Sequence, residues 1–316
     1  MDKGQASGLL KEAYEKLKAS DAAAACVLLE QALDFDYENG EIKYALKCVH
    51  WWLEQTRRID DIKNPYEKGA SIMSLMKQYY VFLGQLNQVY EQIEFEQCQY
   101  AVRYFVFSRA LFFFHGLLRN PVNQHDAGLL LLTGRCYKGL GSYNEALDYL
   151  EQAVSINKDD AEILAELADV NAMLSQVKDA KALFREAFFL DPKKIELRSL
   201  ESALIIKLRD KVAELGFKDE ALCEWMPVYG YLWKVFSVKR ELKQMEAGRL
   251  KQSIFSMEAE YESNPSRRSL LKPRLLNHYF RLIDHYEIIH EDSSLIEETL
   301  LKIKVTDPDI YNIYAG

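Results

Sequence analysis

Residues that form turns are scarce in this sequence of 316 residues, which has 14 glycines and only 7 prolines. A β-sandwich or β-barrel needs a turn roughly every 8–12 residues, so this composition argues against an all-β protein. Hydrophobic residues make up 49% of the chain and charged residues 28%, which is a globular composition and excludes collagen-like and low-complexity classes. No segment shows the clean alternation of a strand. We therefore expect an all-α fold.

Basic charge is also in deficit, because the formal net charge is −8 and the isoelectric point is near 5.4. Affinity for nucleic acid depends on basic side chains that neutralise phosphates, so no nucleic-acid partner is expected. The densest basic segment, residues 266–274, lies beside Asn264-Pro265. We interpret it as a solvated loop, with contact to an acidic partner as the alternative.

Cysteines are few and are not arranged in pairs. The five, at positions 26, 48, 98, 136 and 223, include no CxxC spacing and are odd in number. Reduced thiols, and hence a cytoplasmic location, are the simplest interpretation. The first 18 residues are polar and show no targeting pattern.

Long apolar runs are absent as well. The most apolar stretch, residues 101–118, is interrupted by Arg103, Arg109 and His115. It falls short of the roughly 20 apolar residues that span a bilayer. We predict a buried helix and no membrane span, with a membrane-facing hairpin as the alternative.

Motifs that carry catalysis or bind cofactors are missing. The sequence has no GxSxG, P-loop, GxGxxG or HExxH pattern, so we expect no enzymatic activity and no cofactor. His278 and His285 are seven residues apart and share a helix face, but their neighbours on that face are apolar. Residues 34–41 resemble a calcium loop, but Gly40 is seventh where the motif requires the sixth position. No metal site is predicted.

Two adjacent segments of 34 residues, 127–160 and 161–194, align without a gap. In each segment small residues stand at positions 8, 20 and 27, a turn residue stands at position 15, and larger residues stand at positions 17 and 24. Small residues allow two helices to approach closely, and large apolar residues fill the space between helix pairs. These positions are Gly134, Gly141, Tyr143, Ala146, Leu150 and Ala153 in the first segment, and Ala168, Ser175, Val177, Ala180, Phe184 and Ala187 in the second.

This pattern resembles the tetratricopeptide repeat family. The second segment also closes with Asp191-Pro192, which is typical of the family, whereas the first has Asn157-Lys158 there. The resemblance implies a right-handed α-solenoid of antiparallel helix pairs, flanked here by less regular helices. It implies helix pairs at about 127–156 and 160–190, with Ala146 and Ala180 tightly packed.

A weaker unit of the same kind fits residues 6–39, with Ala13, Ser20, Ala25, Leu29 and Ala32 at the corresponding positions. We therefore divide the chain into residues 1–56 with degenerate repeat-like helices, an irregular helical segment 57–126, two tandem repeats at 127–194, and a C-terminal helical region 195–316.

The C-terminal region is expected to contain several helices. Periodicity predicts a helix over 195–215 that ends at Gly216, and a short helix from 219 that meets Pro227. The sparse glycine and proline content of 228–262 predicts one long helix there, with further helices at 270–289 and 293–305. Two apolar stripes are expected on the long helix. One can pack onto the preceding repeats, and the other needs cover, either from these last helices or from a second molecule in a homodimer.

The resemblance further implies a concave groove that binds a peptide or a partner protein. The family's groove positions 2, 5, 9, 12 and 13 correspond to Gly128, Leu131, Arg135, Lys138 and Gly139 in the first repeat, and to Glu162, Ala165, Asp169, Ala172 and Met173 in the second. We expect Arg135, Lys138, Asp169 and Met173 to lie outside the core.

One family subgroup clamps the C-terminal carboxylate of chaperones with a Lys/Asn/Arg set. Leu131, Arg135 and Glu166 stand at the clamp positions here, which argues against that specificity. The sequence thus predicts a non-enzymatic scaffold or adaptor for a protein or peptide partner. The alternative is a helical ligand-binding or transport-accessory protein, with a pocket between the repeats and the flanking helices.

Overall fold

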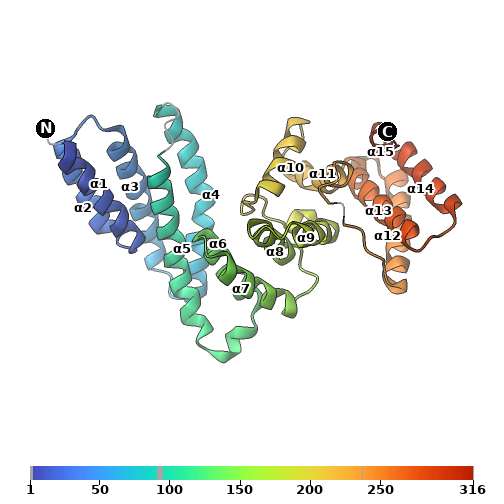
Figure 1. Ribbon diagram of the computed structural model, residues 1–316, viewed down its shortest axis with the longest axis horizontal. Helices are drawn as coiled ribbons and strands as arrows, with labels where there is room; N and C mark the ends of the chain where they lie inside the picture. Colours follow the sequence, from blue (N-terminus) through green and yellow to red (C-terminus); the bar gives the residue numbers. More distant parts are fainter. Residues whose placement is uncertain (1–2, 91–94, 237, 316) are drawn as a thin grey trace. The chain divides into compact units, whose positions relative to one another are not determined.

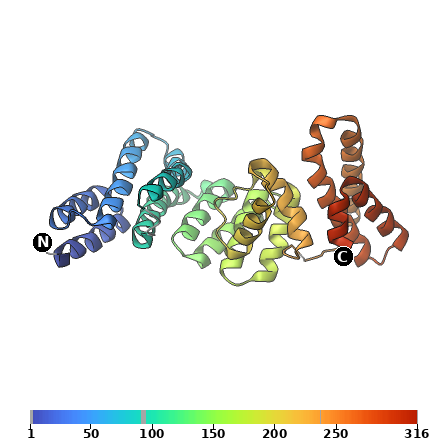
Figure 2. The ribbon, with the colours of Figure 1, turned by 90° about the horizontal axis from the view of Figure 1, so that it is seen from above.

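The computed structural model describes residues 3–90, 95–236 and 238–315, and these residues form fifteen α-helices, three short 3-10 helices and no strand (Figures 1 and 2). The predicted all-α class is therefore confirmed. The chain divides into two compact units, residues 1–156 and 157–316. The boundary between the units falls inside the segment 127–194, near the end of the first predicted repeat.

The first unit contains seven α-helices in its described part. They are α1 Lys3–Lys18, α2 Ala22–Phe35, α3 Gly40–Asp60, α4 Pro65–Val89, α5 Glu96–Leu118, α6 Ala127–Gly139 and α7 Tyr143–Ile156, with the 3-10 helix η1 Pro121–His125 between α5 and α6. The irregular helical segment predicted over 57–126 thus contains the end of α3, the helices α4 and α5, and η1, and residues 91–94 of that segment lie outside the described residues.

The second unit contains eight α-helices in its described part. They are α8 Ala161–Met173, α9 Val177–Leu190, α10 Ala203–Glu214, α11 Asp219–Leu232, α12 Gln244–Ser263, α13 Arg268–Ile288, α14 Ser293–Thr306 and α15 Pro308–Ala315, with the 3-10 helices η2 Pro192–Lys194 and η3 Pro265–Arg267. The helix pairs α6–α7 and α8–α9 lie where the repeat pattern predicts them.

The same turn joins the helices of all three predicted repeat units. The residue at position 15 has a positive φ in each: 65° at Ser20, 81° at Gly141 and 64° at Ser175. In each turn the next residue donates its backbone N–H to the carbonyl five residues earlier, at 2.8–2.9 Å. This is the Schellman arrangement that ends a helix with a left-handed residue. It also supports the repeat register of the N-terminal unit, α1–α2, where the sequence signal is weakest.

The small residues of the pattern let the paired helices approach closely. Ala146 and Ala180 are both 0% exposed, as predicted. A Cβ atom added to Gly134 would lie 2.7 Å from Cγ of Leu150, which occupies position 24 on the facing helix α7. Position 8 of the first repeat is therefore glycine because a larger side chain has no room there.

Helix α5 packs into the core of the first unit. Its buried residues are Cys98, Ala101, Val102, Phe105, Val106, Ala110 and Phe114. Phe105 contacts the fully buried Trp52 of α3, with ring centroids 6.2 Å apart. Among the described residues, α5 is the one helix long and apolar enough to cross a membrane by length and composition, and a third of that apolar stretch is buried in the structure. A core helix meets the same criteria, as the sequence-based interpretation of residues 101–118 expects.

The prediction of a single long helix over residues 228–262 is wrong. Helix α11 runs through Pro227 and ends at Leu232, and α12 begins only at Gln244. Lys234 has a φ of 59°, and Phe236 donates its backbone N–H to Gly230 at 2.8 Å. A Cβ atom on Gly230 would lie 2.5 Å from the Phe236 ring. The chain therefore folds back over Gly230 and buries Phe236; residue 237 lies outside the described residues.

Two other C-terminal predictions need correction. Residues 195–202 are not helical, and α10 begins at Ala203, although it ends as predicted next to Gly216, whose φ is 94°. The short helix from residue 219 does not stop at Pro227 but continues past it. Helices α13 and α14 match the predicted segments 270–289 and 293–305 closely, whereas α15 is not anticipated by the sequence pattern.

Candidate functional site

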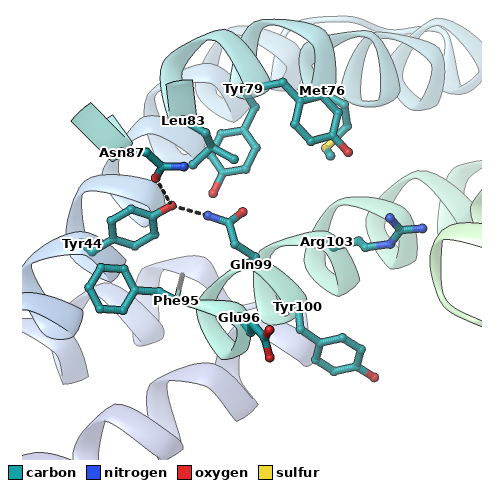
Figure 3. Close-up of a pocket in the computed structure, with 11 residues that line it drawn as sticks. Tyr44, Met76, Tyr79, Leu83, Asn87, Phe95, Glu96, Gln99, Tyr100 and Arg103 are labelled. Atoms are coloured by element: carbon teal, nitrogen blue, oxygen red, sulfur yellow. Dashed lines mark hydrogen bonds between the residues drawn. The ribbon is translucent and has the colours of Figure 1, made fainter. Parts of the chain in front are cut away.

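A hollow of about 520 Å³ opens in the first unit between α3, α4 and the first turns of α5 (Figure 3). We call it the α4–α5 groove. Its lining is mostly aromatic and aliphatic, with a few polar side chains, and consists of Tyr44, Met76, Tyr79, Tyr80, Leu83, Asn87, Phe95, Glu96, Gln99, Tyr100 and Arg103. Such a lining is typical of a ligand or peptide site.

The floor of the α4–α5 groove is a hydrogen-bonded tyrosine packed on a phenylalanine. The rings of Tyr44 and Phe95 are 4.4 Å apart. The Tyr44 hydroxyl donates to Oδ1 of Asn87 at 3.1 Å and accepts a hydrogen bond from Nε2 of Gln99, so that three helices converge on one oxygen atom (Figure 3). Burial raises the pKa of Tyr44 well above its ordinary value, so the hydroxyl stays neutral at physiological pH. These contacts hold the floor in a fixed shape.

The rim of the α4–α5 groove exposes aromatic side chains. Tyr80 is 44% exposed and Tyr100 is 57% exposed. Arg103 also lines this groove, and its Nε atom donates to the carbonyl of Gly139 at 2.7 Å, which ties α5 to the end of α6. The rim thus offers partly exposed aromatics of the kind that act as anchors in protein interfaces.

A second hollow of about 500 Å³ adjoins the groove on the α1 side of the same helix. It shares Glu96 and Tyr100 with the α4–α5 groove and is otherwise lined by α1 and α5 residues, among them Lys11, Glu15 and Lys18. The surface across the first turns of α5 is therefore continuous from an aromatic part to a part of mixed charge. A segment several residues long can contact both.

Two of the groove positions predicted in the first repeat face side chains from other helices of the first unit. A Cβ atom on Gly139 would lie 2.3 Å from the Phe107 ring of α5, and one on Gly128 would lie 3.6 Å from the Tyr66 hydroxyl of α4. The remaining positions are Leu131 and Lys138, which are 7% and 3% exposed, and Arg135, which is half-buried. The expectation that Lys138 lies outside the core is therefore wrong.

In the second repeat, Asp169 is also buried rather than exposed. It is 0% exposed, and its carboxylate oxygens accept the backbone N–H groups of Glu201 and Ser202, each at 2.8 Å. The non-helical segment 195–202 folds over α8 and uses this carboxylate to satisfy its backbone. Asp169 therefore has a structural role. The other predicted positions are Ala165, which is buried, and Glu162, Ala172 and Met173, which are half-buried.

The second unit has its own cleft, of about 470 Å³, between the repeat helix α9 and the flanking helices α12 and α13. Arg281 donates to both carboxylate oxygens of Glu186 at 2.7 Å, and Arg240 bridges Glu186 and Glu246. These ion pairs lower the pKa of Glu186, although burial opposes the shift. Exposed Arg249 lies at the edge of the same cleft. We call it the α9–α12 cleft.

The two histidines that we did not expect to bind a metal form hydrogen bonds with backbone groups of the protein. His278 lies in the α9–α12 cleft, and its Nδ1 atom is 2.8 Å from the carbonyl oxygen of Arg274. His285 is buried, and its Nδ1 atom accepts the backbone N–H of Leu242 at 3.3 Å. Each ring thus has a structural hydrogen bond.

The residues of the α4–α5 groove could not be identified from the sequence. Tyr44, Asn87 and Gln99 come from three helices, and no spacing along the chain relates them. The available signal was compositional, namely the 19 tyrosines and 15 phenylalanines, which indicates aromatic surfaces without locating them.

The paired helices with their shared turn define a helical-repeat protein. Residues 123–204 match a family model described as tetratricopeptide repeat. The resemblance noted in the sequence is therefore confirmed for this segment, and the chain contains tetratricopeptide repeats, which are in general modules of protein interaction. A comparison with curated proteins found no match for the chain.

Proposed function

We propose that this protein is a non-enzymatic scaffold or adaptor that binds an extended or helical segment of a partner protein. The general role of tetratricopeptide repeats in protein interaction supports this proposal. The binding of an extended or helical segment is inferred from the α4–α5 groove, with its fixed floor and exposed aromatic rim. We further propose that the partner segment lies in this groove. A right-handed superhelix and a cytoplasmic location remain predictions; the five free cysteines are compatible with a reducing compartment.

The groove is better suited to a peptide than to a small substrate. In its floor, the polar groups of Tyr44, Asn87 and Gln99 bond to one another. At its rim, Tyr80 and Tyr100 expose aromatic area, and aromatic area of this kind anchors protein partners. No arrangement of nucleophile, base and orienting group is evident among the described lining residues.

The exposed aromatics should carry the binding energy. Peptides selected from a random library on the full-length protein provide the probe, and fluorescence anisotropy measures their dissociation constants. Replacing Tyr80 and Tyr100 together by alanine should weaken binding by about tenfold or more, because each replacement removes an anchor worth more than about 1 kcal/mol. Both side chains are substantially exposed, so the fold should be retained.

The matched control is Tyr37→Ala. Tyr37 is 66% exposed in the same unit and does not line the α4–α5 groove. It should leave the affinity unchanged. Equal affinities for the double variant, the control and the unaltered protein would place the binding surface elsewhere.

The α9–α12 cleft favours a second candidate, a ligand-binding or transport-accessory role. It lies between a repeat helix and the flanking helices, as the alternative interpretation of the sequence expects, and its edge carries the exposed guanidinium of Arg249. An anionic small molecule bound there should raise the melting temperature by mass action. A panel of anionic metabolites tests this: a shift seen in the unaltered protein and absent in Arg249→Ala supports the role, whereas no shift with any compound speaks against it.

A further inference from the structure

A cluster of three potential metal ligands lies on the first unit, outside the α4–α5 groove. Cys26 and Glu30 are one turn apart on α2, so their side chains share a face, and His50 reaches them from the adjacent helix α3. Oε1 of Glu30 is 3.7 Å from Sγ of Cys26 and 3.7 Å from Nε2 of His50. All three ligand atoms lie within 4.8 Å of one another.

These separations are close to those of a tetrahedral zinc site. Zinc binds sulfur at about 2.3 Å and nitrogen or carboxylate oxygen at about 2.0–2.2 Å, which puts neighbouring ligand atoms roughly 3.4–3.6 Å apart. The chain therefore needs only small side-chain rotations to close around an ion. The side chains of Glu30 and His50 are 59% and 57% exposed, so they are free to make such rotations.

The contacts within the cluster are weak without a cation. The Cys26 thiol donates to Oε1 of Glu30 across 3.7 Å. The His50–Glu30 contact is long and largely exposed, and a pair of this kind contributes little to stability. A divalent ion would take the place of the thiol proton and neutralise both the thiolate and the carboxylate.

The geometry points to a binding site for a divalent zinc ion formed by Cys26, Glu30 and His50. A mixed sulfur, nitrogen and oxygen set selects zinc over calcium or magnesium, which prefer oxygen ligands alone. Three protein ligands leave the fourth position to water. Because the ligands come from α2 and α3, the bound ion links these two helices across their contact.

The test uses the untagged full-length protein, stripped of metal with a chelator and kept reduced. Calorimetric titration with zinc should show saturable binding of one ion per chain, and the melting temperature should rise with zinc concentration. Cobalt bound in the same place should give an ultraviolet thiolate-to-cobalt charge-transfer band. Cys26→Ser and His50→Gln should each lower the zinc affinity by more than about tenfold, because each removes a direct ligand.

Matched controls are Cys223→Ser and His290→Gln. Cys223 is a half-buried thiol on α11, as Cys26 is on α2, and His290 is an exposed histidine; neither belongs to the cluster. Both should bind zinc as the unaltered protein does. The proposal is overturned if the untagged protein shows no saturable binding, if cobalt binds without a thiolate band, or if the Cys26 and His50 variants keep the original affinity.

Discussion

Replacing Asp284 by alanine is expected to lower the unfolding free energy of the second unit by about 3–5 kcal/mol, because it leaves a buried guanidinium without its counter-ion. Asp284 on α13 is 1% exposed and pairs with Arg185 of α9, which is 9% exposed. Its other carboxylate oxygen accepts the Tyr231 hydroxyl of α11 at 2.9 Å and lies 3.2 Å from Nζ of Lys239. One carboxylate thus joins the repeat helix to the C-terminal helices.

The control for this variant is Glu287→Ala. Glu287 contacts the same Lys239 but is 39% exposed, so its loss should cost less than about 1 kcal/mol. Hydrogen–deuterium exchange of peptides from α9, α11 and α13 reports the stability of this unit separately from the other. If the two variants accelerate exchange equally, Asp284 does not hold the unit together.

Acid should destabilise the second unit well above the pH at which carboxylates titrate. His278 is half-buried and packs against Phe189, with ring centroids 4.8 Å apart. Burial lowers the pKa of His278 to about 4, and the nearby positive charges of Arg281 and Arg274 lower it further. A hydrogen bond to the Arg274 carbonyl partly opposes this shift. The ordinary value is about 6.5.

The sign of this effect follows from proton linkage. Between pH 6.5 and 4 the unfolded chain binds a proton at this histidine and the folded chain does not, so stability falls as the pH falls. From pH 7 to pH 4.5 the loss should be about 2 kcal/mol. Glu246, whose pKa is lowered to about 2 by its hydrogen bond from Arg240, stays ionised in the folded state across this window. Its contribution is lost only at lower pH.

Hydrogen exchange of α12 and α13 peptides at pH 7 and pH 4.5, corrected for intrinsic rates, measures the effect. His278→Gln should remove most of the pH dependence, whereas the control His290→Gln, at an exposed position in the same unit, should keep it. A pH dependence that survives in His278→Gln would show that other groups cause the acid sensitivity.

Much of the fold could be predicted from the sequence because its repeat pattern is local. The turn at position 15 and the small residues at positions 8, 20 and 27 act within 34 residues, so Gly141, Ala146 and Ala180 could be placed correctly. The break between α11 and α12 could not be predicted, because it depends on Phe236 folding back onto Gly230. Neither residue is a strong signal for a helix end, and Pro227, which is one, lies inside a helix.

The predicted groove residues agree less well with the structure than the predicted fold does, for a related reason. The family's groove positions assume that the first helices face open space, but this chain covers them with its own irregular segments. Phe107 of α5 occupies the place beside Gly139, and residues 195–202 bond to Asp169. The zinc cluster was also missed, because Cys26 and His50 are brought together only by the contact of two helices.

The most direct test of the central proposal is to map where a bound peptide lies. A peptide selected on the full-length protein, synthesised with a benzophenone side chain at one position, is cross-linked by light, and the attached residues are identified by mass spectrometry. Binding in the α4–α5 groove predicts attachment at or beside Met76, Tyr80 and Tyr100. Attachment confined to the α9–α12 cleft, or to surfaces that lie in neither hollow, would contradict it.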